Sequence, residues 1–288
     1  MPGTKDRWFK FLLLMPAVLW VLAFTVYPLV AAVRYSFSSY VMGRGIVGWV
    51  GVDNFTNVLT SADFWHSVLI TLIYTVVAVG LEVIIGVALA WVIHLNMPGH
   101  KVFRAIITAP LFTMGVAVGY LGVTLFSSNG GLYAHLLAQI GIEVPWLSTA
   151  TGGLSAAILL DVWRWTSFIF LITLAGLGGI SEELYEAALL DTRNQWTVFR
   201  YVAMPLLKPV VSIALLLRLV ECFKTFGLPY ALTSGGPGTS TQLFSTMDYL
   251  TTIQFFDFGK GSAMGVTFLV LVSVVIVIFF RQMRRQIE

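Results

Sequence analysis

The sequence predicts an all-α, polytopic membrane protein with six transmembrane helices. Of its 288 residues, 58% are hydrophobic and only 11% are charged, and the mean hydropathy is +0.87. Soluble globular domains carry roughly a quarter charged residues, and a soluble chain of this length could not bury so much apolar surface. Six apolar stretches are each long enough to cross a bilayer, which takes about 20 residues per helix.

We place these spans within one transmembrane domain over residues 1–288. The stretches are too long and too uniformly apolar for the alternation of a membrane β-barrel, and helices satisfy their own backbone hydrogen bonds in lipid. The first span has a longer apolar core than a secretory signal and no small-residue cleavage site after it, so we expect an uncleaved anchor. The predicted spans lie near residues 11–33, 67–93, 103–126, 154–177, 203–223 and 262–280.

The basic residues predict the orientation. If the N-terminus is cytoplasmic, only Arg34, Arg44, Lys224 and Lys260 lie outside, and Arg164 and Arg218 lie within spans. Because Lys and Arg accumulate in cytoplasmic segments, we expect both termini and the loop at 178–202 to face the cytoplasm. The basic residues then inside are Lys5, Arg7, Lys10, Lys101, Arg104, Arg193, Arg200, Lys208, Arg281, Arg284 and Arg285.

The sequence carries none of the common enzyme signatures. Gly259-Lys260-Gly261 lacks the leading glycine and the hydroxyl residue of a phosphate-binding loop, and there is no His-Glu-x-x-His or Gly-x-Ser-x-Gly. The single cysteine, Cys222, excludes a disulfide within the chain and a multi-cysteine metal site. We therefore expect no catalytic residues and no metal site. If the protein uses ATP, a separate subunit hydrolyses it.

The loop at 178–202 carries a short charged helix between two apolar spans. Ser181 is a residue type that caps helices, and the acids that follow it favour the positive end of the helix dipole. Ala187 and Ala188 are small enough to let the helix sit deep in a cleft of a partner, and Glu186 could pair with a basic residue there. From these residues alone, a connector helix without a partner is an equally good interpretation.

This loop resembles the cytoplasmic EAA loop of ABC importer permeases. The family motif is Glu-Ala-Ala, three residues, glycine, nine residues, and then an aliphatic residue, any residue, leucine and proline. Here Glu186-Ala187-Ala188 and Val202-Ala203-Met204-Pro205 have that spacing. The chain departs from the motif at the glycine, which is Thr192 here. Thr is poor at positive φ, so either the loop turns differently or coupling is altered.

More specifically, the chain resembles the carbohydrate-uptake branch of that family, of the maltose, trehalose and glycerol-phosphate type. The resemblance extends from about Trp8 to Arg285. The matching segments are Trp49-Val50-Gly51-Val52-Asp53-Asn54-Phe55, Phe64-Trp65, Leu174-Ala175-Gly176-Leu177, Leu232-Thr233-Ser234-Gly235-Gly236-Pro237 and Phe256-Asp257-Phe258-Gly259.

The resemblance implies a sugar importer of the bacterial inner membrane that works by alternating access. Its partners would be a second, related permease (a heterodimer), two ATPase subunits that bind ATP and Mg, and an external solute-binding protein, but no nucleic acid. A glycerol-phosphate permease is the first alternative; a self-sufficient secondary carrier or a membrane enzyme fits the residues less well. The residues expected to couple to the ATPase are Glu183, Tyr185, Glu186, Ala187, Ala188, Asp191 and Thr192.

Ionisable residues inside the spans give a further signal, because charges are costly there and usually face a cavity or a partner. Arg218, Glu221 and Lys224 recur every three residues and share one helix face, as do Asp161 and Arg164. A sugar pathway and mutual ion pairs (Arg218 with Glu221, Asp161 with Arg164) are both open interpretations, and Glu82 in the second span fits either. Candidates for solute contact are Trp163, Arg164, Glu221, Phe223 and Lys224.

Glycine-rich stretches mark the segments expected outside. Turn formers at this density predict structured loops, and we expect Gly235, Gly236 and Pro237 to shape the outer mouth where a binding protein docks. Two small-residue spacings, Gly115-x-x-x-Gly119 and Gly261-x-x-x-Gly265, predict close helix packing.

Overall fold

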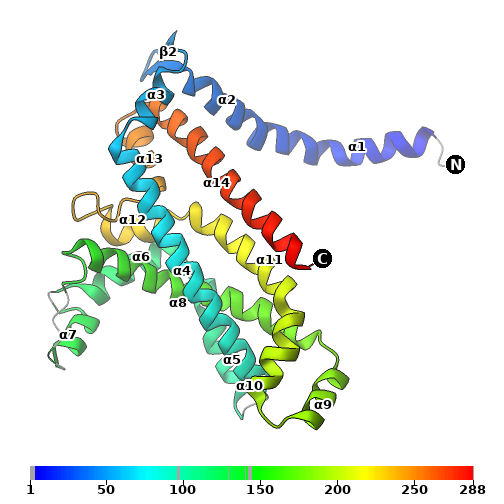
Figure 1. Cartoon of the computed structure of the whole chain (residues 1–288). Helices are drawn as coiled ribbons and strands as arrows, with labels where there is room; N and C mark the ends of the chain where they lie inside the picture. Colours follow the sequence, from blue (N-terminus) through cyan, green and yellow to red (C-terminus); the bar gives the residue numbers. More distant parts are fainter. Residues whose placement is uncertain (1–3, 96–97, 129, 140, 142–144, 288) are drawn as a thin grey trace. The chain divides into compact units, whose positions relative to one another are not determined.

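The computed structural model of the chain describes residues 4–95, 98–128, 130–139, 141 and 145–287 (Figure 1). Helices account for almost all of its regular structure, which confirms the all-α prediction. Among the described residues, five helices are long and apolar enough to cross a membrane, and each overlaps an expected span. They are Phe11–Ser36, Ala62–His94, Ala150–Gly178, Gln195–Phe223 and Phe258–Met283.

The remaining expected span, 103–126, is a bent pair of helices. Helix α5 (His100–Thr108) and the 3-10 turn η2 (Ala109–Phe112) are followed by α6 (Gly115–Phe126), and the two halves of the pair meet at an angle of 102°. Between them, Thr113 and Met114 have extended backbone conformations, and the apolar pattern alone gives no sign of such a break. The two halves together are long and apolar enough for a sixth, broken span.

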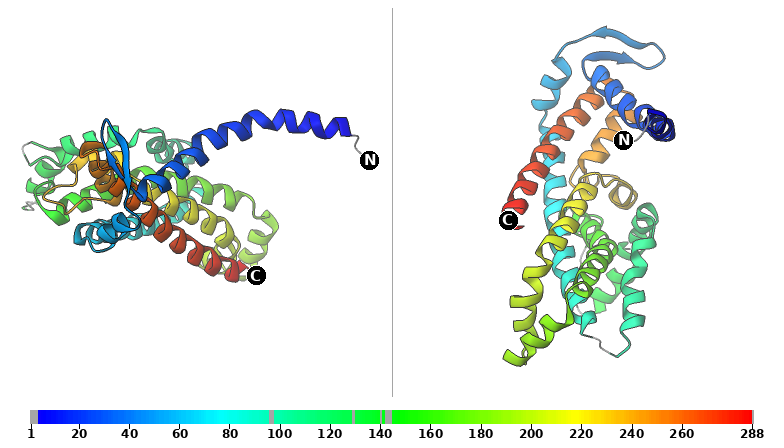
Figure 2. Two further views of the ribbon diagram at one scale, coloured as in Figure 1. Left: turned by 90° about the horizontal axis from the view of Figure 1, so that it is seen from above. Right: turned by 90° about the vertical axis from the view of Figure 1, so that its right-hand side faces the viewer.

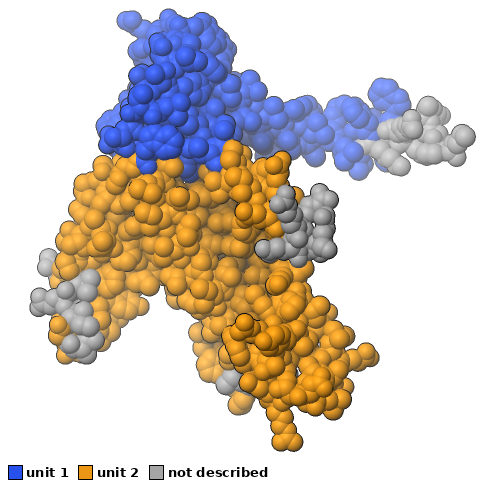
Figure 3. All heavy atoms as spheres, viewed as in Figure 1, with its two compact units in different colours: residues 1–65, 247–271 blue, residues 66–246, 272–288 orange. Residues whose placement is uncertain are grey.

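The chain folds into two compact units (Figure 3). Unit 1 comprises residues 1–65 and 247–271, and unit 2 comprises residues 66–246 and 272–288. Helix α4 (Ala62–His94), helix α13 (Phe244–Tyr249) and helix α14 (Phe258–Ile287) each contribute to both units.

Unit 1 begins with a long apolar helix and a short hairpin. Helix α1 (Thr4–Val21), the π-helical turn η1 (Leu22–Val26) and α2 (Tyr27–Ser36) form the first candidate span, none of whose apolar window is buried within the chain. A helix that is apolar all round must be covered by lipid or another protein. Antiparallel strands β1 (Ser38–Val41) and β2 (Gly45–Trp49) follow.

A polar residue fastens the next helix of unit 1 to this hairpin. Helix α3 (Asp53–Leu59) carries Asn54, whose side-chain amide donates hydrogen bonds to the carbonyls of Ser36 and Ser38, each at 3.0 Å. The π-helical turn η4 (Leu250–Gln254) and the first half of α14 also belong to this unit.

In unit 2, α8 (Ala150–Gly178) packs against both α4 and α11 (Met204–Phe223) (Figure 2). Gly86 of α4 and Gly176 of α8 allow the close approaches: a Cβ at Gly86 would lie 2.8 Å from Ile169, and one at Gly176 would lie 3.0 Å from Leu207. Helix α10 (Gln195–Val198) and the π-helical turn η3 (Phe199–Ala203) precede α11. Pro205 lies just after the π-helical turn η3 within the continuous helix Gln195–Phe223. The wider turn lies where proline cannot donate the usual helical hydrogen bond.

Three shorter helices complete unit 2. Helix α12 (Gly227–Thr233) packs against α6, while α7 (Leu132–Gln139) follows α6, and α9 (Glu182–Asp191) lies between α8 and α10. The α6–α12 contact explains one of the small-residue spacings, because a Cβ at Gly119 would lie 2.6 Å from the carbonyl oxygen of Leu228. In the second spacing, an added Cβ at Gly261 would collide with Thr252, whereas one at Gly265 would meet nothing within 4 Å.

Candidate functional site

Helix α9 is the helix expected between the fourth and fifth spans, and it is acidic and exposed. Its sequence, Glu-Glu-Leu-Tyr-Glu-Ala-Ala-Leu-Leu-Asp, carries four acids and no basic residue. Ser181 has the extended conformation of an N-cap residue, but its side chain makes no capping hydrogen bond. The carboxylates of Glu182 and Glu183 in the first turn instead stabilise the helix by interacting with the positive end of its dipole. The four acids, all exposed, are Glu182, Glu183, Glu186 and Asp191.

Tyr185 attaches α9 to the rest of unit 2. Its hydroxyl donates a hydrogen bond to the carbonyl of Leu177, near the end of α8, at 3.4 Å. Its ring lies 5.1 Å from that of His94 and 6.5 Å from that of Trp91, both near the end of α4. Partial burial raises the pKa of the Tyr185 hydroxyl, so it stays a neutral donor. Ala188 is also partly buried against this core, whereas Ala187 is exposed.

Thr192 occupies the position of the family glycine without backbone strain. Its φ is −151° and its ψ is 139°, an extended conformation that a β-branched residue adopts readily. Its hydroxyl accepts a hydrogen bond from the backbone amide of Asn194 at 3.1 Å, and the Asn194 side chain caps α10 through the amide of Trp196 at 3.0 Å. The loop therefore turns without positive φ at Thr192.

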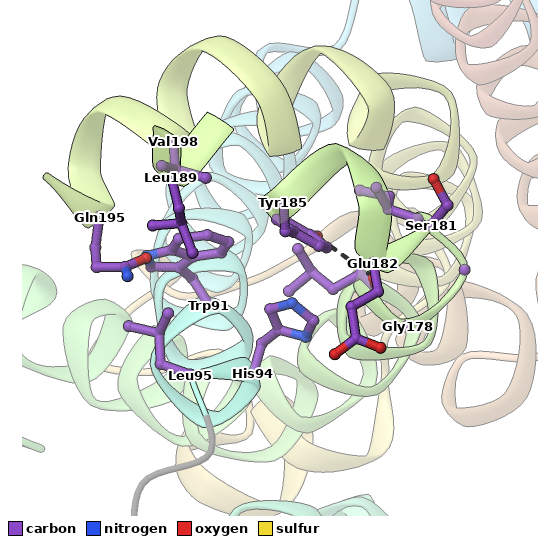
Figure 4. A pocket seen from close by; sticks show the side chains of 13 residues that line it. Trp91, His94, Leu95, Gly178, Ser181, Glu182, Tyr185, Leu189, Gln195 and Val198 are labelled. Atoms are coloured by element: carbon purple, nitrogen blue, oxygen red, sulfur yellow. Dashed lines mark hydrogen bonds between the residues drawn. The ribbon is translucent and has the colours of Figure 1, made fainter. Parts of the chain in front are cut away.

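A cavity of about 670 Å³ lies beside α9 (Figure 4). The ends of α4 and α8 line it together with α9 and α10, and the side chains of Trp91, His94 and Tyr185 form part of its wall. Sequence patterns do not predict this cavity, because its aromatic residues lie about 90 positions apart along the chain. The lining residues are Trp91, His94, Leu95, Leu177, Gly178, Gly179, Ile180, Ser181, Glu182, Tyr185, Leu189, Gln195 and Val198.

A buried charge cluster lies in the interior of unit 2. The Arg218 guanidinium on α11 binds Glu82 on α4 through two hydrogen bonds, Nε to Oε2 at 2.7 Å and Nη2 to Oε1 at 2.9 Å. The same Nη2 also donates to Asp161 of α8. All three side chains are at most 1% exposed. The cluster therefore joins three helices through charges that have no access to water.

The aromatic ring of Trp165 lies against this cluster. The guanidinium carbon of Arg218 is 4.7 Å from the centre of the ring, and that of Arg164 is 4.9 Å from it. Arg164 also donates from Nε to the carbonyl of Thr113 at 3.0 Å, at the bend between α5 and α6. Both cations thus gain an attraction to the same ring.

The structure contradicts the ion pairs expected within single helices. Arg218 pairs with Glu82 and Asp161 instead of Glu221, and Arg164 binds a backbone carbonyl instead of Asp161. Residues three positions apart share one face of a single helix, whereas a buried charge can be reached by partners on the helices that pack around it. Spacing along one helix cannot show such partners.

Residues proposed for solute contact lie in two places. Trp163 and Arg164 are on α8, where Trp163 is exposed and Arg164 partly buried. At the end of α11, Phe223 is buried, and Glu221 pairs with Lys224 at 2.8 Å on the exposed surface. Nothing in this arrangement tests a role in solute contact, which stays a prediction.

The glycine-rich loop after α12 is held in place by threonine side chains. The hydroxyl oxygens of Thr233 and Thr241 lie 2.7 Å apart, and Thr241 donates to the carbonyl of Gly236 at 2.7 Å. Gly235 has a φ of +93°, which a residue with a Cβ would adopt only under strain. The loop is thus structured, as its turn formers predict.

Comparison with known families identifies the class of protein. Residues 82–287 match the family described as the inner membrane component of binding-protein-dependent transport systems. The chain belongs to this family. It is a multi-pass membrane component of a transport system, and the family match covers the buried charge cluster, the α9 segment and the loop after α12.

Curated relatives resemble this permease over nearly its whole length. The trehalose/maltose transport system permease protein MalF of Thermococcus litoralis is 33% identical over 93% of this chain and 91% of its own. A probable ABC transporter permease of Sinorhizobium fredii is 36% identical over 90% of this chain and 84% of its own. The sulfoquinovosyl glycerol transport system permease protein SmoG of Agrobacterium fabrum is 31% identical over 97% and 91%.

A solved structure shares the fold. A chain of a bacterial ABC transporter involved in the import of the acidic polysaccharide alginate superposes with a TM-score of 0.85, at 24% identity, over 98% of this permease and 96% of that chain. The similarity in structure extends over both units and supports the helical architecture described above.

Proposed function

We propose that this permease is a subunit of an ATP-driven ABC importer that carries a di- or oligosaccharide across the inner membrane by alternating access. The observation that carries the proposal is the similarity to sugar permeases over nine tenths of the chain, including a trehalose/maltose permease at 33% identity. The acidic helix α9, fastened to the ends of α4 and α8, supplies the part through which an ATPase would act.

In this proposal, α9 is the coupling helix and faces the cytoplasm together with both termini. Two ATPase subunits bind ATP and Mg. One ATPase subunit binds this permease, and the other binds a second, related permease. Tyr185 and Ala188 pack against the core formed by α4 and α8, while the acids of α9 stay exposed. A displacement of α9 by the ATPase would therefore be transmitted directly to α4 and α8. The contact residues are Glu183, Tyr185, Glu186, Ala187, Ala188, Asp191 and Thr192.

On the outer side, the loop with Gly235, Gly236 and Pro237 would receive a solute-binding protein. The threonine hydrogen bonds that fix this loop would present a preformed surface to it. Within the membrane, aromatic rings would stack on the sugar while charged groups bond its hydroxyls. The residues proposed for these contacts are Trp163, Arg164, Glu221, Phe223 and Lys224.

The substitution Glu186→Gln tests the coupling role. The permease pair, the ATPase and the binding protein would be reconstituted in vesicles, and uptake of labelled trehalose or maltose would be measured together with ATP hydrolysis. We expect uptake to fall at least about tenfold, which corresponds to a barrier to transport higher by about 1.4 kcal/mol, with an unchanged melting temperature of the permease. Unchanged uptake would show that Glu186 does not couple.

The solute itself is best assigned through the cognate binding protein. Calorimetric titration of that protein with trehalose, maltose, sulfoquinovosyl glycerol and a glycerol-phosphate diester would rank the candidates. Binding of a glycoside supports the proposal, and binding of the diester alone would move the permease to the glycerol-phosphate branch.

A further inference from the structure

We propose that the cavity beside α9 receives a lysine or arginine side chain of the ATPase partner. The inference rests on the proposed function, since it takes α9 as the surface that the ATPase grips. It adds a second contact to that surface: Glu183, Glu186 and Asp191 of α9 lie outside the cavity, whereas Glu182 lines it, between α9 and the ends of α4 and α8 (Figure 4).

The wall of the cavity has the composition of a cation-binding site. Trp91, His94 and Tyr185 line it, with ring centres 5.8 Å apart for Trp91 and His94 and 5.1 Å apart for His94 and Tyr185. The faces of aromatic rings carry negative charge density that attracts ammonium and guanidinium groups. The hydrogen bond from Tyr185 to Leu177 fixes one ring of this wall.

Two helix ends add to the negative character. Helices α4 and α8 both reach the cavity with their C-terminal residues, among them His94 and Gly178. The C-terminal end of a helix carries a partial negative charge, which stabilises a nearby cation. The opposing positive end of α9 is offset by its first two residues, Glu182 and Glu183.

The only formally charged side chain among the thirteen lining residues is the carboxylate of Glu182, and none of them is Lys or Arg. The other three acids of α9 lie on the same short helix. This charge disfavours an anion such as a nucleotide phosphate. It complements a basic side chain, and the volume of about 670 Å³ exceeds what one such side chain needs, so the backbone that carries it could enter too.

The test measures binding of the purified ATPase to the permease pair in nanodiscs at increasing NaCl concentration. Glu182→Gln should raise the Kd by about fivefold at low salt, the size expected for one exposed ion pair, and should make binding less dependent on salt. Glu182→Lys should raise it further. Asp63→Asn, which changes an exposed acid at the opposite end of α4, is the matched control and should bind as the original chain does.

The outcomes separate this inference from the proposed function. If the unaltered permease does not bind the ATPase, the proposed function is wrong. If it binds, but Glu182→Gln leaves both the Kd and its salt dependence unchanged, the cavity does not receive a basic side chain. Nanodiscs of phosphatidylglycerol with and without phosphatidylethanolamine complete the test: an effect of Glu182→Gln that requires the amine lipid would assign the cavity to a lipid headgroup and overturn the inference.

Discussion

Arg218 and Glu82 lie 136 positions apart in the sequence, yet they form a bidentate ion pair at 2.7 and 2.9 Å in the interior of unit 2. Asp161 completes the cluster from a third helix. Removing one partner of a buried pair leaves a charge that neither water nor protein compensates. The three side chains therefore depend on one another, which makes the cluster testable by substitution.

We expect Arg218→Met to destabilise the permease strongly. The substitution leaves Glu82 and Asp161 buried without their cation, and breaking a buried pair costs about 3–5 kcal/mol. Thermal unfolding in detergent, followed by tryptophan fluorescence, should show a markedly lower melting temperature.

The exposed pair provides the control for this experiment. Lys224→Met breaks an ion pair whose side chains are 62% and 49% exposed, and such pairs contribute at most about 1 kcal/mol. Replacing Glu82, Asp161 and Arg218 together by Leu, Leu and Met should recover most of the stability. Equal effects of Arg218→Met and Lys224→Met would show that the cluster does not hold the helices together.

Gly119→Ala should loosen the contact between α6 and α12. The new Cβ would lie 2.6 Å from the Leu228 carbonyl oxygen and 2.7 Å from the Cβ of Ala231, so the backbone of α12 must shift. Overpacking of this kind costs about 1–3 kcal/mol, and the melting temperature should fall. Gly80→Ala on α4, where an added Cβ meets nothing within 4 Å, should leave it unchanged or raise it; a fall of equal size would refute the packing argument.

Asp248 should make stability depend on pH. It lines a hollow of about 210 Å³ in unit 1, and burial raises its pKa from 3.8 to about 6, although a hydrogen bond from Thr252 opposes the shift. The folded state then binds the proton more tightly than the unfolded state. Its stabilising contribution is complete below about pH 4 and is lost as the pH rises through 6.

Asp248→Asn tests this dependence directly. It should raise the melting temperature at pH 8, with a gain of up to about 3 kcal/mol, and should flatten its decline between pH 4 and pH 7. If the Asp248→Asn variant keeps the original profile, the carboxyl group of Asp248 does not carry the raised pKa.

Much of the architecture could be predicted from composition and span length. The apolar runs identified five long helices directly, because a bilayer imposes length and hydropathy on each helix separately. The break near Thr113 is missed because Pro110 and Gly115, the local signals of a break, lie inside a run long enough to be one span. The bend also involves a tertiary contact that the sequence does not show, the hydrogen bond from Arg164.

The candidate site divides in the same way. The spacing around Glu186 located α9, because the motif is local. The partners of Arg218 could not be predicted. Its spacing in the sequence suggests Glu221 as the partner, whereas Glu82 and Asp161 lie on other helices and contact Arg218 only in the folded protein. At Thr192 the departure from the motif left two interpretations open, a different turn or altered coupling, and the extended backbone shows a turn without positive φ.

The buried cluster also bears on how the protein is made. Helices α4 and α8 leave the ribosome before α11, so Glu82 and Asp161 enter the membrane while their counter-ion is still unsynthesised. A chain that stops before residue 204 carries both acids without the guanidinium group that pairs with them in the folded protein. Completion of α11 is therefore the step of synthesis at which α4 and α8 gain their shared counter-ion and the three helices can assemble.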